Sequence, residues 1–117
     1  MYQGLIVPTY PYPRSSASSL GVSVGSHNLY SMDADQENIA VKTVMLHEDY
    51  DSWTITNDIC LLELAAEATF GDHVAAIALP AQNEEYASGT DCIVTGWGAT
   101  SEGGDLARVL QKVSIFF

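Results

Sequence analysis

A carboxylate stands at the head of a strongly apolar run in the segment TNDICLLELA, residues 56–65. The turn-rich residues before Asp58 lead into the strongest strand signal of the chain, residues 58–64. A buried carboxylate is costly unless a hydrogen-bond donor or an opposite charge accompanies it. Asp58 is therefore either a turn residue just outside the strand, or a buried group whose interaction with a partner offsets the free-energy cost of burial.

Further strand signals follow one another along the chain, with turn signals between them. We expect strands at residues 20–25, 39–47, 58–64, 92–98 and 109–117, and an extended segment at residues 74–80. The first nineteen residues contain the proline-rich stretch PTYPYP and a serine-rich tract, and they are expected to be irregular. Several short strands of this kind predict an all-β barrel or sandwich.

Charge and length restrict the function. The chain has 117 residues, enough for one modest core, and its 15 Asp and Glu against 4 Lys and Arg give a formal net charge of -11. This charge argues against binding to nucleic acids and to anionic membranes, because both need cationic side chains. No apolar run approaches the roughly 20 residues of a membrane helix, and the N-terminus lacks the features of a signal peptide.

Four blocks follow one another along the chain: VSVGSHNL (22–29), VMLHEDYDSWTITNDICLLEL (44–64), VAAIALPAQ (74–82), and DCIVTGWGATSEGG with VLQKV (91–104 and 109–113). In this order they resemble the chymotrypsin/trypsin-like serine proteases, the S1-type peptidase domain. The string Thr-Gly-Trp-Gly in the last block is one of the family's more specific motifs. The amino-acid sequence of these blocks is most similar to that of arthropod digestive trypsins.

The resemblance implies an all-β fold that is part of the family's double six-stranded antiparallel β-barrel. Residues 1–19 are then an atypical irregular N-terminal segment, and residues 20–117 a partial protease domain. Within this domain, 20–79 would belong to the first barrel, 80–90 to the connector and 91–117 to the start of the second barrel. We therefore expect the chain to be a fragment, comprising the rest of the first barrel and the start of the second.

By the same resemblance, Asp58 is the acid of a Ser-His-Asp triad. Such an acid is buried, accepts a hydrogen bond from the histidine Nδ1–H, and stabilises the imidazolium that forms during catalysis. This role would explain a carboxylate at the start of an apolar strand. Without the resemblance, a plain turn involving Asn57 would be the favoured interpretation.

The other two triad members are not found in the sequence. In the family the histidine precedes the aspartate by about 45 residues and the serine follows it by about 93 residues. No histidine precedes Asp58 at that distance, no Ala-Ala-His-Cys or Gly-Asp-Ser-Gly occurs, and the serine would lie beyond residue 117. His27, His47 and His73 are expected to be surface or structural residues. The chain as given is expected to be inactive.

Neither a metal ligand nor a cofactor is assigned. The family has a calcium loop anchored by glutamates, and the matching positions are Ser26 and Gln36, which leaves calcium binding open. The resemblance gives Cys92 a partner outside these residues, so Cys92 is expected to be unpaired and Cys60 to be a buried free thiol. A disulfide between the two cysteines is the alternative.

The segment SEGGDLAR, residues 101–108, resembles the family's mobile loop. Arg108 at its end would be an exposed cleavage site for a trypsin. Trp97, just before this loop, is expected to pack at the start of the second barrel.

Three functions are compatible with these features of the sequence. The first is a fragment of a secreted trypsin-like endopeptidase, whose full-length form would bind polypeptide substrates or protein inhibitors. The second is a non-catalytic protease homologue that uses the barrel as a binding module. The third is an acidic β-domain of unknown role. The presence of the histidine and serine in the full-length protein would separate the first from the second.

Overall fold

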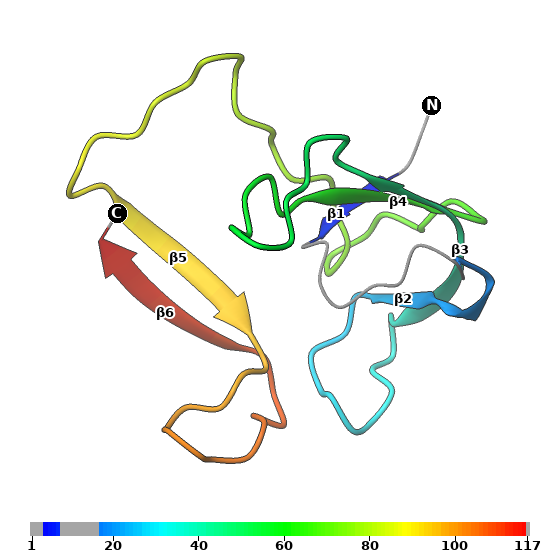
Figure 1. Ribbon diagram of the computed structural model, residues 1–117. Helices are drawn as coiled ribbons and strands as arrows, with labels where there is room; N and C mark the ends of the chain where they lie inside the picture. Colours follow the sequence, from blue (N-terminus) through cyan, green and yellow to red (C-terminus); the bar gives the residue numbers. More distant parts are fainter. Residues whose placement is uncertain (1–3, 8–16, 117) are drawn as a thin grey trace. The chain divides into compact units, whose positions relative to one another are not determined.

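The computed structural model describes residues 4–7 and 17–116, and these residues are all-β, as the sequence predicted (Figure 1). No α-helix occurs within them. In chain order the elements are β1 (Gly4–Val7), the 3-10 turn η1 (Ala17–Ser19), β2 (Gly21–Val24), β3 (Glu37–Leu46), β4 (Cys60–Leu64), β5 (Asp91–Gly96) and β6 (Gln111–Phe116). All five expected strands are recovered to within two residues at each end, and the extended segment 74–80 forms no regular strand.

The chain divides into two compact units. The first contains the described parts of residues 1–24 and 37–74, and the second contains residues 25–36 and 75–116. The segment 25–36 thus leaves the first unit between β2 and β3 to become part of the second. The domain boundaries expected at residues 79 and 91 stay predictions.

The first unit is built on a four-stranded antiparallel sheet with the order β1-β4-β3-β2 (Figure 1). Its central pair is β3 with β4, in which Leu46 lies opposite Cys60 and Val44 opposite Leu62. On the outer side of β3, Val22 of β2 pairs with Ile39. Long β3 therefore joins the two halves of the sheet.

The register of β3 against β4 shifts between Val41 and Thr43, as at a β-bulge. At this irregularity two side chains donate hydrogen bonds to the Glu63 carboxylate. Lys42 Nζ lies 2.6 Å from Oε1 and Thr43 Oγ1 lies 2.9 Å from Oε2. The bond from Lys42, followed by that from Thr43, lowers the pKa of Glu63.

Strand β1 corrects the expectation that residues 1–19 are irregular. Its residues Gly4–Val7 pair with β4, placing Leu5 opposite Leu62 and Val7 opposite Cys60. The run LIV is short, but its branched apolar residues suit a strand once a partner edge is available. The partner edge is β4, which lies more than fifty residues further along the chain. The residues around β1 therefore give no local signal of this pairing. Residues 8–16 lie outside the described part of the chain.

The core of the first unit is small. Among the described residues its buried side chains are Ile39, Val41, Cys60 and Leu62. Cys60 is 2% exposed and takes part in no disulfide among the described residues, which confirms the predicted buried thiol; Cys92, in β5, is likewise outside any disulfide there. The partly buried residues Ala17, Leu20, Val22, Val44 and Leu46 pack against this core.

The apolar run of β4 is buried on one face alone. Cys60 and Leu62 are buried, whereas Leu61 between them is 42% exposed. Side chains alternate between the two faces of a strand, so an apolar run with a core on one side leaves every second residue uncovered. The predicted strand is confirmed, and its apolar run includes a residue on the exposed face.

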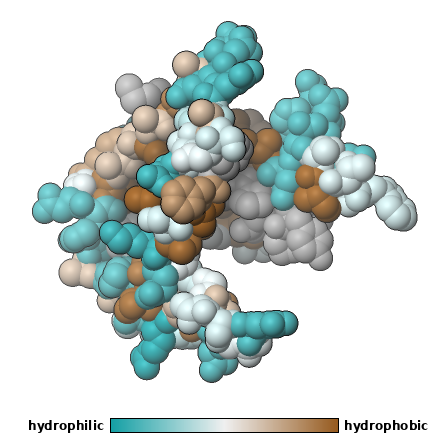
Figure 2. All heavy atoms as spheres, turned by 90° about the vertical axis from the view of Figure 1, so that its left-hand side faces the viewer, coloured by the Kyte–Doolittle hydropathy of each residue, from teal (hydrophilic) through white to brown (hydrophobic). Residues whose placement is uncertain are grey.

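The second unit contains the antiparallel hairpin β5–β6, in which Cys92 lies opposite Ile115 and Val94 opposite Val113. Its apolar side chains are exposed: Ile93 is 66% exposed and Phe116 is 79% exposed. On the face drawn in Figure 2, hydrophobic side chains reach the surface among hydrophilic ones. No helix in the described part of the chain is long and apolar enough to cross a membrane.

The contrast between Leu62 and Leu61 yields a test of the core. Replacing Leu62 by Ala should lower the free energy of unfolding by about 2–5 kcal/mol, because it leaves a cavity in the buried cluster that Leu62 forms with Val41 and Cys60. Replacing Leu61 by Ala is the matched control, and it should cost about 1 kcal/mol or less because that side chain already meets solvent. Urea denaturation of the chain and its two variants measures both values. Equal losses would contradict the one-sided core.

Candidate active site

Asp58 lies two residues before the start of β4 and is half-buried. The preceding Asn57 has φ of 53°, in the left-handed region that asparagine tolerates better than most residues. Directly after this turn, the Ile59 N–H donates to the Asn57 carbonyl over 2.8 Å. The chain thus bends sharply on either side of Asp58 before entering the sheet. Asp58 therefore lies outside strand β4, and its catalytic role stays a prediction.

Asp58 lies two residues before Cys60, whose side chain is buried in the core. Burial, together with the charge of Asp58, raises the pKa of the Cys60 thiol. The raised pKa favours the neutral form of this thiol, which belongs to the buried cluster of the first unit. The arrangement places a negative charge at the border of an apolar interior, where solvent screens it less than at an open surface.

The loop between β3 and β4 closes on itself. At its base, the His47 N–H donates to the Ile59 carbonyl over 3.1 Å, and further in, the Asp51 N–H donates to the Thr56 carbonyl over 3.2 Å. The side-chain amide of Asn57 donates to the Asp49 carbonyl over 3.0 Å. These bonds tie the turn at Asn57 to both sides of the loop and so set the position of Asp58.

The tip of this loop combines a carboxylate with an exposed indole. Asp51 Oδ1 accepts the Trp53 N–H over 2.8 Å. This bond, followed by one from the Thr54 side chain, lowers the pKa of Asp51. The Trp53 side chain itself is 94% exposed. Ile55, two residues later, has φ of 54°, a strained value for a β-branched residue.

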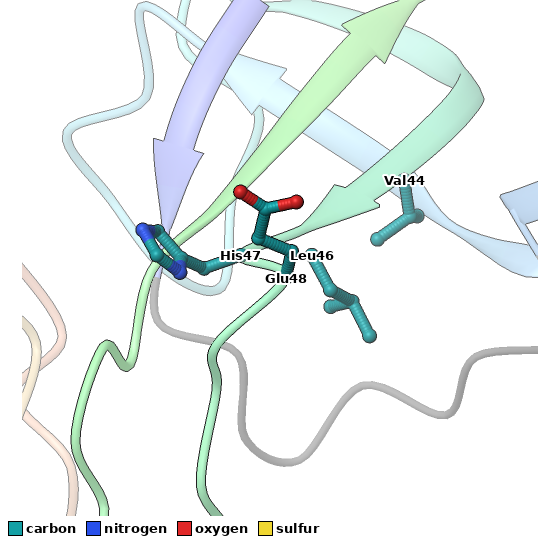
Figure 3. Close-up of a pocket in the computed structure, with 4 residues that line it drawn as sticks. All are labelled: Val44, Leu46, His47 and Glu48. Carbon is teal, nitrogen blue, oxygen red and sulfur yellow. The ribbon is translucent and has the colours of Figure 1, made fainter.

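His47 directly follows β3 and lines an open pocket of about 310 Å³ with Val44, Leu46 and Glu48 (Figure 3). Its Nδ1 accepts the Asp49 N–H over 3.1 Å, so the neutral ring carries its proton on Nε2. In Figure 3 the ring lies apart from the apolar side chains of Val44 and Leu46. Asp58 is not among the lining residues. His73 follows the exposed turn at Gly71 in the first unit, and His27 lies in the second unit.

The segment implied to bind calcium does not offer a suitable donor set. Ser26 and Gln36 are neutral, and their side chains take part in hydrogen bonds within the loop: Ser26 Oγ donates to the Asn28 carbonyl, and Gln36 Oε1 accepts the Asp33 N–H. Asp33 Oδ2 accepts two backbone N–H groups. A calcium site needs six to eight oxygens, several of them from carboxylates. Within the described residues, no cluster of three or more His, Cys, Asp or Glu is arranged to hold a metal ion.

Sequence reasoning identified Asp58 but missed the two left-handed residues before it. Asparagine before aspartate is a turn signal, and it could have indicated the bend at Asn57. Nothing local could have indicated the left-handed Ile55, because isoleucine strongly disfavours that conformation. The loop holds it there through the bonds at its base.

Comparison with known proteins places the chain among serine proteases. The family model described as Trypsin matches residues 13–116. Trypsin-1 of Astacus astacus is 44% identical over 98 residues, which are 84% of this chain and 40% of that protein. Trypsin V-A of Rattus norvegicus is 39% identical over 94 residues, covering 79% of this chain and 37% of that protein. The chain therefore spans about two fifths of the length of these relatives.

Granzyme B of Rattus norvegicus is a relative under another name. It is 35% identical over 100 residues, which are 86% of this chain and 40% of that protein. The similarity thus extends beyond proteins called trypsin.

The lowered pKa of Asp51 predicts how the loop responds to acid. Because the folded pKa lies below that of the unfolded chain, the bond from Trp53 contributes stability above the unfolded value, and this contribution is lost as pH falls through the folded value. The Trp53 backbone amide should therefore shift and exchange faster only in acid below the usual range of an aspartate. NMR titration of that amide measures the midpoint. The variant Asp51→Asn should abolish the titration, and a midpoint at or above the usual aspartate range would contradict the assigned bond.

Proposed function

The chain belongs to the trypsin family of serine proteases, and from that premise we propose that it is part of a secreted serine endopeptidase that hydrolyses polypeptides. The family match over residues 13–116 is the observation that carries the proposal. Because the chain spans about two fifths of its curated relatives, we propose that the remaining catalytic groups belong to further segments of a longer protein.

We assign Asp58 the role of the triad acid. In that role its carboxylate accepts the Nδ1–H of the catalytic histidine, selects the tautomer whose Nε2 can take the serine proton, and stabilises the imidazolium that results. Support comes from its place at the border of the core, where its charge acts on Cys60. A carboxylate interacts more strongly with an imidazolium there than in open water.

The loop 47–57 would keep that carboxylate in place. A triad acid contributes mainly by orienting the catalytic histidine, so a small displacement of its carboxylate would lower the catalytic rate strongly. The bonds from His47 to Ile59 and from Asn57 to Asp49 fix the loop on both sides of the acid. A rigid turn at Asn57 is therefore what such a mechanism needs.

The assignment predicts the effect of Asp58→Asn in the full-length protein. An amide at this position accepts from or donates to the imidazole without a charge and favours the wrong tautomer, so kcat should fall by about 10⁴-fold, the magnitude known for this change in Ser-His-Asp triads. Hydrolysis of a peptide substrate with a chromogenic leaving group measures it. Asp72→Asn, an exposed aspartate of the same unit, is the matched control and should leave kcat unchanged.

Two outcomes would contradict the proposal. If Asp58→Asn retains the kcat of the unaltered protein, Asp58 is not the triad acid. If the full-length protein lacks the histidine or the serine and hydrolyses no peptide, the barrel serves as a binding module instead. Sequencing the transcript across both ends of this chain distinguishes the latter case in advance.

A further inference from the structure

The segment 25–36, which matches the family's calcium loop, is organised around a carboxylate in this chain. Asp33 is half-buried, and its Oδ2 accepts the His27 N–H over 2.6 Å and the Asn28 N–H over 2.8 Å. Two successive backbone N–H groups therefore converge on one oxygen. Hydrogen bonds from backbone N–H groups to a carboxylate are shorter and stronger than those between neutral groups. Asp33 thus fixes the backbone at the start of the segment.

A calcium ion has the opposite requirement. It is surrounded by six to eight oxygens from carboxylates, carbonyls and waters, so the groups around it must present lone pairs and not N–H protons. A cation bound at Asp33 Oδ2 would face the partial positive charges of the two N–H groups that already bond to this oxygen. The backbone around Asp33 is therefore arranged for an internal anion.

Other oxygens of the segment already accept hydrogen bonds. The His27 carbonyl accepts the Leu110 N–H over 2.9 Å and Trp97 Nε1 over 3.0 Å. The side-chain oxygen of Asn28 accepts the Tyr30 N–H over 3.0 Å. A calcium ion would have to replace these bonds before it could use the same oxygens fully, and the replaced donors would then lose their partners.

The two positions that match the family's glutamates support the carboxylate-centred turn. Gln36 is linked twice to Asp33: its Oε1 accepts the Asp33 N–H over 3.4 Å, and its own N–H donates to the Asp33 carbonyl over 3.2 Å. Ser26 is half-buried and donates its hydroxyl to the Asn28 carbonyl. Both side chains are neutral, so the segment lacks the two negative charges that would attract a divalent cation to these positions.

We propose that the Asp33 carboxylate replaces calcium as the group that organises the segment 25–36, so that this segment is ordered without a metal ion. The organising charge belongs to the chain itself, and its partners are backbone N–H groups instead of oxygens. The inference takes from the family only the expectation of a calcium loop. It does not depend on Asp58 having a catalytic role, so either proposal can fail alone.

A calcium titration of the chain, followed by NMR, tests the independence from metal. The shifts and hydrogen-exchange rates of the His27 and Asn28 amides should be the same in about 10 mM calcium chloride as in equal magnesium chloride with EGTA, a comparison in which charge screening cancels. A site with a dissociation constant of about 10⁻⁴ M would instead favour the ordered segment about a hundredfold. A saturable shift change or slower exchange specific to calcium would overturn the proposal.

The variant Asp33→Asn tests the carboxylate. Exchange of the His27 and Asn28 amides should become about tenfold faster or more, because a hydrogen bond to a charged acceptor is worth at least that factor. Calcium should not slow it again. Asp105→Asn is the matched control: it makes the same change at an exposed position of the same unit and should leave both rates unaltered.

The amides of Val94 and Val113, which lie opposite each other in β5 and β6, show whether the hairpin stays folded in these variants. Their exchange should not change in Asp33→Asn, and Asp33→Glu, which keeps the charge, should recover part of the protection of His27 and Asn28. The proposal is overturned if Asp33→Asn leaves those two amides unaffected or if calcium restores their protection. It is also overturned if the hairpin amides accelerate equally, because general unfolding would then be the cause.

Discussion

The antiparallel pairing of β3 with β4 is the interaction on which the first unit depends. It brings Val41 together with Cys60 and Leu62, and these three side chains form the buried cluster of that unit. The same pairing supplies β4 as the edge on which β1 forms. Loss of contact at Leu62 would therefore affect three strands, which is why a core of so few residues can hold the sheet.

The pairing also sets the geometry at Asp58. Because β3 ends at Leu46 and β4 begins at Cys60, the chain between them must return within a short distance, and the bond from His47 to Ile59 closes this return. Asp58 lies next to that closure, after the left-handed turn at Asn57. Its position at the border of the core follows from strand register, so the core and the proposed triad acid are two consequences of one arrangement.

The second unit is stabilised differently. Its hairpin has little buried apolar surface, and a two-stranded hairpin alone is marginally stable in water. Residues 25–36 add backbone bonds to residues 108–110 and accept the Trp97 indole bond beside this hairpin. These bonds join the two separate parts of the chain that make up the second unit.

Local patterns in the sequence determined the all-β class, the five strands β2 to β6, the buried thiol of Cys60 and, through the family motifs, the choice of Asp58 as the candidate site residue. Each of these rests on residues close together in the chain, where alternation, turn residues and motif spacing carry the information. Tertiary structure alone decided the strand at Gly4–Val7, the exposed face of β4, the left-handed Ile55 and the pairing of residues 27–29 with residues 108–110. These features depend on partners tens of residues away, and no local propensity encodes which distant backbone groups will meet or which face of a strand a core will cover.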